Sequence, residues 1–202
     1  ESLERKLIDS QPEIEAYLRR KWTELKTPFY GSVDVRMSGF KVAPVDTNLF
    51  PGGFNNLNKD FHPLTVQAMM AAANSLCGAG SSVLLIPENH TRNPYYLENV
   101  ATIFKLLTQA GVRVRIGTLI PEVTAPTPFV TPSGVTLTYE PLVRKGDKLG
   151  LDNFDPCAVL LNNDLSAGIP EILKGLSQPV VPPIYSGWST RRRPFRNASS
   201  VK

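Results

Sequence analysis

The chain has 202 residues, of which 42% are hydrophobic and 20% charged, a composition typical of a soluble globular protein of about one domain. Its formal net charge is +4, but five of its 22 basic residues lie in the last twelve positions, and without them 17 basic residues stand against 18 acidic ones. A nearly neutral body argues against a broad nucleic-acid surface, and no stretch approaches the roughly 18–20 apolar residues of a membrane span. We therefore expect a cytosolic chain with neither a nucleic-acid nor a membrane partner.

The two cysteines, Cys77 and Cys157, are far apart in the sequence and do not have the spacing of paired metal ligands. Buried free thiols are the default for such residues, so no disulfide is predicted. With only two histidines, His62 and His90, the sequence also predicts no metal centre.

The N-terminal segment is predicted to form a helical leader. A short helical turn is expected over residues 2–9, and Ser10 with Glu13 has the pattern of a capping box for a helix over residues 11–26. Apolar residues recur at helical spacing from Ile14 to Leu25, which predicts that one face of this helix packs on another element.

From residue 41 the sequence alternates between strand and helix patterns. Buried strands are predicted at Val83–Pro87 and Ala158–Leu161, which are unbroken apolar runs. Further strands are expected over residues 41–45, 112–116, 135–140 and 179–182, the one at 112–116 near an edge because arginines alternate with valines. Helices are expected over residues 63–77, from Asn93-Pro94 to Gly111, and over 170–176.

This order predicts an α/β fold, an open and mostly parallel sheet with helices on both faces. Residues 1–190 are expected to form this domain with its helical leader, and residues 191–202 a basic tail. The Pro/Thr-rich stretch 121–133 is interpreted as a connection between strands.

Polar residues cluster after three of the predicted strands, and open α/β sheets bind ligands at the carboxyl ends of their strands. The first cluster is Asp46, Asn48, Asn55 and Asn56, around a Pro-Gly-Gly turn; the second runs from Glu88 to Asn93 and includes Asn89 and Arg92; the third is Asn162, Asn163, Asp164 and Ser166. Amides, carboxylates and an arginine together suit an amino acid better than a nucleotide or a sugar. Neither a Walker-type loop nor a strand-to-helix Gly-x-Gly-x-x-Gly motif is present.

Simpler interpretations of these residues stay open. Asn93 is expected to act chiefly as a helix cap, and residues 162–164 fit a turn as well as a site. His90 fits a hydrogen-bonded loop residue as well as a general base, and one of Tyr95 and Tyr96 is expected to be packed and the other exposed. The Asn/Gly-rich turn at residues 52–56 could equally satisfy its own backbone.

The segment Val33–Leu57 resembles the N-terminal half of a proteobacterial type of glutamate–cysteine ligase. Residues 87–93, 162–166 and 182–192 are similar to the same family, so that the resemblance covers nearly all of residues 1–192. It implies ATP-dependent formation of γ-glutamylcysteine from L-glutamate and L-cysteine, with chemistry like that of ATP-grasp ligases, and a Rossmann-like, pre-ATP-grasp-like domain here.

The resemblance also implies where the ligands would bind. ATP and Mg²⁺ would bind mainly in a C-terminal half missing from this chain, so that the chain alone is expected to be inactive. Asp46 would hold a substrate ammonium group, Asn48, Asn55 and Asn56 would orient the substrate, and Arg92 would bind an α-carboxylate. Arg191 and Arg192 would lie at the junction with the ATP-binding half.

Two other functions are compatible with the same residues. One is a non-catalytic amino-acid-binding or regulatory module, and the other is an interaction domain that uses the Pro-rich segments and the basic tail. A homo-oligomer is compatible with each of the three functions.

Overall fold

Two fully buried strands form the centre of the fold, as the apolar runs predict. They are β3 (Ser82–Pro87) and β9 (Ala158–Asn162), and every residue of both is buried. The structure is a computed structural model that describes residues 2–89 and 93–191. By backbone contacts the chain divides into two compact units, Glu1–Pro51 and Gly52–Lys202, which are described separately below.

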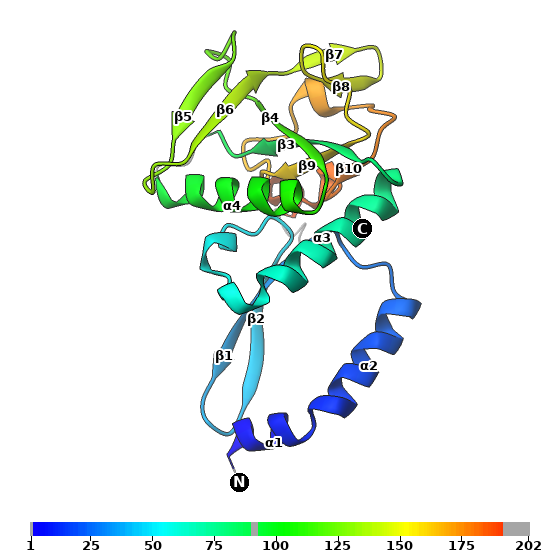
Figure 1. Cartoon of the computed structure of the whole chain (residues 1–202), viewed down its shortest axis with the longest axis vertical. Helices are drawn as coiled ribbons and strands as arrows, with labels where there is room; N and C mark the ends of the chain where they lie inside the picture. The colour runs from blue at the N-terminus through cyan, green and yellow to red at the C-terminus, as the bar shows by residue number, and fades with distance from the viewer. Residues whose placement is uncertain (1, 90–92, 192–202) are drawn as a thin grey trace, which may run out of the picture. The chain divides into compact units, whose positions relative to one another are not determined.

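The second unit contains a six-stranded sheet with the order β10-β9-β3-β4-β6-β5 (Figure 1). The other strands are β4 (Arg113–Thr118), β5 (Thr127–Val130), β6 (Thr136–Pro141) and β10 (Val180–Val181). All neighbours pair in parallel except β5, which runs antiparallel to β6. The prediction of a mostly parallel α/β sheet is therefore confirmed.

Helices α3 (His62–Cys77) and α4 (Tyr95–Gln109) follow the predicted boundaries and pack against each other. Gly111 has a φ of +77° just past the end of α4, the left-handed conformation that ends many helices and that glycine adopts readily. Of the two tyrosines at the start of α4, Tyr96 is buried and Tyr95 exposed, as expected. In the 170–176 region only a short 3₁₀ helix, η3 (Glu171–Leu173), forms.

Strand β4 is not near an edge, which corrects the prediction made from its alternating arginines. It lies between β3 and β6. Arg115 pairs with Glu140 of β6, where its Nε donates to Glu140 Oε1 over 2.7 Å, and its guanidinium lies 5.3 Å from the ring centre of Phe154. An arginine is tolerated on this interior strand because its charge is paired and about a third of its side chain (34%) stays exposed to solvent.

Two hairpin elements were not predicted. The Pro/Thr-rich connection contains β5, whose Phe129 stacks on Tyr139 of β6 with ring centres 3.9 Å apart. A small hairpin, β7 (Val143–Lys145) with β8 (Lys148–Gly150), precedes β9, and Leu142 and Leu151 near its ends lie against Gly117 of β4.

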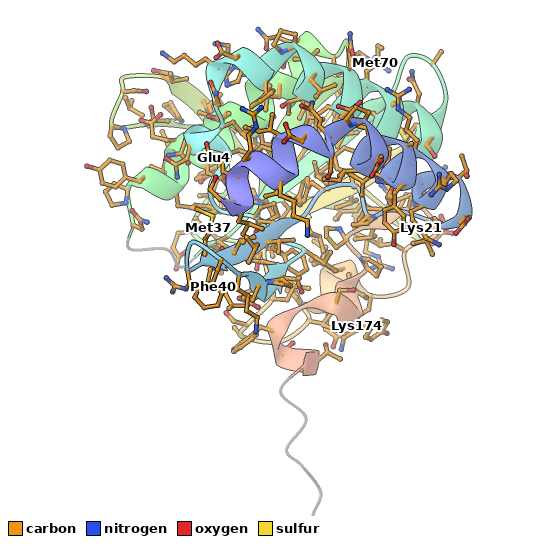
Figure 2. All side chains as sticks on the ribbon, turned by 90° about the horizontal axis from the view of Figure 1, so that it is seen from below. Glu4, Lys21, Met37, Phe40, Met70 and Lys174 are labelled. Atoms are coloured by element: carbon orange, nitrogen blue, oxygen red, sulfur yellow. A yellow bond between two sulfur atoms is a disulfide. The ribbon has the colours of Figure 1, made fainter. Side chains whose placement is uncertain are left out.

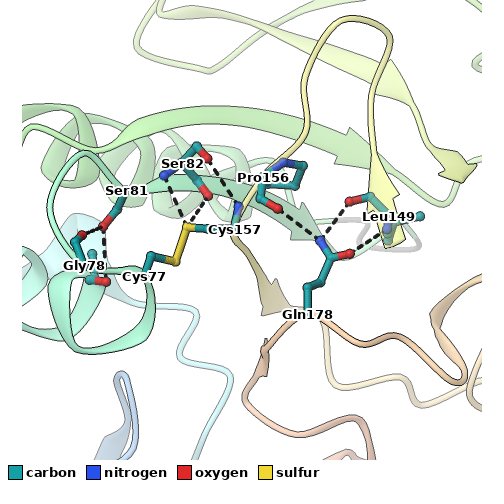
Figure 3. The surroundings of a disulfide bond; sticks show 9 residues. Cys77, Gly78, Ser81, Ser82, Leu149, Pro156, Cys157 and Gln178 are labelled. Atoms are coloured by element: carbon teal, nitrogen blue, oxygen red, sulfur yellow. Dashed lines mark hydrogen bonds between the residues drawn. A yellow bond between two sulfur atoms is a disulfide. The ribbon is translucent and has the colours of Figure 1, made fainter. Parts of the chain in front are cut away.

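The cysteines form a disulfide, so the prediction of free thiols is wrong. Cys77, the last residue of α3, is bonded to Cys157, which directly precedes β9, with Cα atoms 5.8 Å apart (Figure 3). The backbone N–H of Cys157 donates to the carbonyl of Ser82 over 2.8 Å. Residues 80 apart in the sequence are thus joined at the amino edge of the sheet, the side on which the parallel strands begin.

The first unit comprises α1 (Leu3–Asp9), α2 (Gln11–Glu24) and a hairpin of β1 (Ser32–Met37) with β2 (Val42–Asn48). The two helices agree with the predicted ones, but the Ser10 side chain makes no capping hydrogen bond, so the capping box is wrong. No residue of α2 is buried within the first unit, and the docking of its apolar face stays a prediction. Met37 and Phe40, at the tip of the hairpin, are 71% and 84% exposed (Figure 2).

The strand predicted at 41–45 exists as β2, but it pairs only with β1 in an antiparallel ladder and is not part of the parallel sheet. β1 and β2 are consecutive in the sequence, whereas the central sheet strands β3 and β9 pair although they are far apart in it. In the described part of the chain, no helix is long and apolar enough to cross a membrane.

Candidate functional site

A polar pocket lies at the carboxyl ends of the two central strands. Its volume is about 190 Å³. Glu88 and Asn89, which follow β3, form one side, and Asn163, Asp164 and Ser166, which follow β9, form the other. These strands are hydrogen-bonded neighbours whose last paired residues are Pro87 and Asn162, so both clusters leave the sheet at the same level. The structure thus brings Glu88 and Asn89 of the second cluster beside three residues of the third.

The turn after β9 is held by its own side chains. Asn163 Oδ1 accepts from the amide of Leu165 over 2.9 Å, and its Nδ2 donates to the carbonyl of Pro87 over 3.2 Å. Asp164 Oδ1 accepts from the amide of Ser166 over 2.9 Å. The turn interpretation is thus confirmed, and the same turn forms one wall of the pocket.

Leu165, in the middle of this turn, has a φ of +52° although it is almost fully buried. A bulky residue adopts this left-handed conformation at a cost of about 1–2 kcal/mol, so the surrounding contacts must hold it there. The amide of Trp188 also donates to the carbonyl of Asp164 over 2.8 Å. The turn after β9, which forms one wall of the pocket, is therefore held both by its own side chains and by the backbone of Trp188.

Asn162 does not take the position of a ligand-contacting residue. It is 1% exposed, and its Oδ1 accepts from Asn99 Nδ2 over 2.9 Å and from Tyr96 Oη over 2.7 Å. Its side chain belongs to a buried network under the ends of the strands, and the proposal made from the sequence, that it touches substrate, receives no support from this geometry.

The first predicted cluster is divided between the two units. Asp46 and Asn48 lie within β2 of the first unit, not after its end as expected, and both bind local amides: Asp46 Oδ1 accepts from Thr47 and Asn48 Oδ1 from Phe50, each over 2.8 Å. Asn55 and Asn56 lie in the second unit, in the 3₁₀ helix η1 (Phe54–Asn56), and are exposed.

The arginine predictions fall on positions that the structure does not describe. His90, Arg92, Arg192 and the rest of the basic tail lie outside the described residues, and of Arg191 only the backbone is described, as the last residue of the short helix α5 (Trp188–Arg191). Their proposed roles stay predictions.

Asn93 makes a local cap. Its Oδ1 accepts from the amide of Tyr95 over 3.0 Å at the start of α4, as the helix-cap interpretation predicts. The amide of Glu88 donates to Tyr96 Oη over 2.9 Å, so that the end of β3 is tied to the same helix.

The pocket offers carboxylates, amides and a hydroxyl. Glu88 and Asp164 supply negative charge, and Asn89, Asn163 and Ser166 supply groups that donate and accept hydrogen bonds. This mixture suits a small ligand with a positively charged end, such as an ammonium group. Among the described residues no group of three or more His, Cys, Asp or Glu side chains is arranged to hold a metal ion.

Four residues of this region were not predicted as functional. Glu88 and Ser166 lay inside the predicted clusters, and their position directly after buried strands was the signal that could have identified them. Tyr96 was considered only as one of a packed and exposed pair, and Asn99 was not considered; the available signal for Asn99 was an asparagine among the apolar residues of α4.

Comparison with known proteins identifies the family. A family profile described as GshA, glutamate-cysteine ligase, matches residues 4–197. A solved structure assigned to a gamma-glutamylcysteine synthetase of Methylobacillus flagellatus KT is 57% identical, with a TM-score of 0.84, over 94% of this chain and 45% of that chain. No curated protein matches. The chain thus spans less than half the length of this solved relative, and it belongs to the glutamate–cysteine ligase family.

Proposed function

We propose that this chain supplies part of the amino-acid site of an ATP-dependent glutamate–cysteine ligase, which joins L-glutamate and L-cysteine as γ-glutamylcysteine. The observation that carries the proposal is the pocket in which Glu88 and Asn89 of one strand end meet Asn163, Asp164 and Ser166 of the next. Family membership supports the reaction, and the chemistry of the lining supports an amino acid as the ligand.

The carboxylates of Glu88 and Asp164 are proposed to bind the ammonium group of the amino acid. A pair of carboxylates near an ammonium ion gives strong charge-assisted hydrogen bonds. The amides of Asn89 and Asn163 would orient the rest of the molecule, and Arg92, Arg191 and Arg192 are proposed partners for a substrate carboxylate. Asp46, Asn48, Asn55 and Asn56 remain proposed contributors from outside the pocket.

The described lining does not fit a nucleoside triphosphate. Its described side chains include no lysine or arginine that would bind a phosphate group directly, and its volume of about 190 Å³ suits a smaller molecule. We therefore propose that ATP and Mg²⁺ bind mainly outside this chain, and we assign no phosphoryl-transfer step to these residues. Their part in the reaction is to bind and orient an amino acid.

Thermal unfolding with L-glutamate, L-cysteine or Mg-ATP, added separately, tests the proposal. An amino acid at about 100 times its dissociation constant should stabilise the chain by roughly 2.7 kcal/mol, and Mg-ATP should have little effect. Asp164→Asn keeps the Oδ1 acceptor of the turn but removes the charge, so we expect it to abolish the shift.

Asp147→Asn is the matched control, because Asp147 is an exposed acid of the β7–β8 turn, away from the pocket lining. It should leave the shift unchanged. The proposal fails if neither amino acid stabilises the wild-type chain, or if both variants respond like wild type.

A further inference from the structure

Helix α4 places polar side chains on its buried face. Asn99 is 0% exposed and Tyr96 is buried, among the apolar residues Val100, Ile103 and Leu107 of the same helix. A buried amide or hydroxyl costs free energy unless it is hydrogen-bonded. The hydrogen-bond partners of Tyr96 and Asn99 therefore show which segments these two side chains hold in place.

Asn99 bridges two segments that are distant in sequence. Its Nδ2 donates to Asn162 Oδ1 over 2.9 Å, and its Oδ1 accepts from the amide of Phe54 over 2.9 Å. Phe54 is the first residue of η1, which carries Asn55 and Asn56 and packs on α4. One buried amide thus joins the end of β9 to η1.

The Tyr96 hydroxyl makes a second bridge, between β9 and β3. It lies 2.6 Å from the carbonyl oxygen and 2.7 Å from the Oδ1 of Asn162, to which it donates, and it accepts from the amide of Glu88 over 2.9 Å. Glu88 itself lines the pocket, and Asn162 directly precedes the pocket residue Asn163. Both walls of the pocket are therefore tied to a single phenol.

The side-chain pairs Asn99–Asn162 and Tyr96–Asn162 are not needed to bury α4, since replacing both partners of a buried hydrogen bond by apolar groups of similar shape is often nearly neutral for stability. The bonds to the backbone amides of Phe54 and Glu88 satisfy donors of the segments that they hold. What the bonds do fix is the direction in which three backbone segments leave the core. Each is next to, or part of, a proposed substrate contact.

We infer that Tyr96 and Asn99 are positioning residues of the ligase, which set the amino-acid site by holding the ends of β3, β9 and η1 in one geometry. The inference rests on the proposed function and adds residues that touch no substrate. It predicts that variants lacking these bonds bind the amino acid more weakly even when the protein is fully folded.

The experiment uses Tyr96→Phe and Asn99→Asp in the protein as its gene encodes it. Tyr96→Phe removes one hydroxyl and keeps the packed ring, so folding is preserved. Asn99→Asp keeps the shape of the side chain and the acceptor for Phe54, but it places a carboxylate at a fully buried position, against Asn162 Oδ1. We expect Tyr96→Phe to raise the KM for glutamate or cysteine by about fivefold, the weight of one hydrogen bond, and Asn99→Asp to raise it further, with the KM for ATP unchanged in both.

Gln178→Met is the matched control. Gln178 is also a buried amide that bonds backbone, donating to the Leu149 carbonyl over 2.8 Å and accepting from the Leu149 amide over 2.6 Å, but it lies at the amino edge of the sheet (Figure 3). It should lower the free energy of unfolding measured in urea and leave every KM unchanged.

The outcomes distinguish a failure of the positioning role from a failure of the proposed function. A rise in the KM for an amino acid in Tyr96→Phe and Asn99→Asp, but not in Gln178→Met, supports the positioning role. An active wild type in which all three variants keep their KM values overturns that role alone. A wild type without ligase activity overturns the proposed function and, with it, this inference.

Discussion

The amino and carboxyl edges of the six-stranded sheet, where its parallel strands begin and end, differ in how they are closed. At the amino edge, the disulfide Cys77–Cys157 joins α3 to the start of β9, and Gln178 binds both backbone groups of Leu149 (Figure 3). At the carboxyl edge, Tyr96, Asn99 and Asn162 form a buried network, but the strands open into a polar pocket instead of being closed by a covalent bond.

The difference shows how a parallel sheet separates stability from binding. All strands that run the same way place their starts at one edge and their ends at the other, so one edge can be closed while the other keeps polar groups available for a ligand. We therefore expect changes at the amino edge to alter the free energy of unfolding, and changes at the carboxyl edge to alter ligand binding as well.

The largest effect is expected from removing the disulfide. The Cys77→Ala/Cys157→Ala double variant should lose about 4 kcal/mol of unfolding free energy, because the bond closes a loop of some 80 residues in the unfolded chain. Amino-acid affinity per folded molecule should not change. Denaturant unfolding of the oxidised and reduced wild type and of the variant measures this, and equal stability of all three would contradict it.

Two glycines allow the pocket to be compared with a region away from it. A Cβ at Gly187 would collide with the carbonyl oxygen of Asp164, and a Cβ at Gly150 would collide with that of Phe154. Alanine at either position should cost about 1–3 kcal/mol, because well-packed backbone must move.

Only Gly187→Ala moves a pocket residue, so only this variant should weaken the stabilisation by glutamate or cysteine in thermal unfolding. Gly150→Ala is the control. Equal ligand responses from both variants would break the comparison between the regions.

A third prediction concerns Tyr139 of β6 and the stability of the sheet at alkaline pH. Burial raises the pKa of Tyr139 to about 12, above its usual value near 10. As the pH rises, Tyr139 therefore loses its proton at a lower pH in the unfolded chain than in the folded one. Its contribution to stability is fully present below pH 10 and is lost as the pH rises toward 12. The loss is of the order of 2 kcal/mol, allowing for partial solvent screening, and Tyr139→Phe should remove this part of the pH dependence. The result is contradicted if the variant and wild type titrate alike.

The smallest expected effect concerns helix capping at the carboxyl edge. Asn93→Ala should cost about 1 kcal/mol, because Asn93 caps α4, the helix that carries Tyr96 and Asn99. Asn58, whose Oδ1 accepts from the Asp60 amide over 3.1 Å, makes the same local bond at the short 3₁₀ helix η2 (Lys59–Phe61) and is the matched control. Urea unfolding should show a smaller loss for Asn58→Ala, and a larger one would contradict the importance of α4.

The sequence alone determined the central layer of the fold and the family. Uninterrupted apolar runs predicted β3 and β9, and an asparagine–proline start with a glycine end predicted α4, because burial and capping are local patterns. The two strand-end clusters that line the pocket could each be identified from the sequence, because both directly follow a buried strand; that they meet depends on the pairing of β3 with β9.

Only the tertiary structure decided which segments pair. Apolar residues and arginines alternate at the start of β4 as on an edge strand, but β4 lies between β3 and β6, where Glu140 pairs with Arg115. Likewise, β2 has an ordinary strand pattern, but in the structure it pairs with β1 and not with the six-stranded sheet.

The same holds for the contacts that join distant residues. The Cys77–Cys157 bond and the Asn99–Asn162 hydrogen bond connect positions 80 and 63 residues apart. Spacing along a chain carries no information on such pairs, because their distance is set by how helices pack on the sheet. The sequence thus determined which elements form, and packing decided which of their polar groups meet.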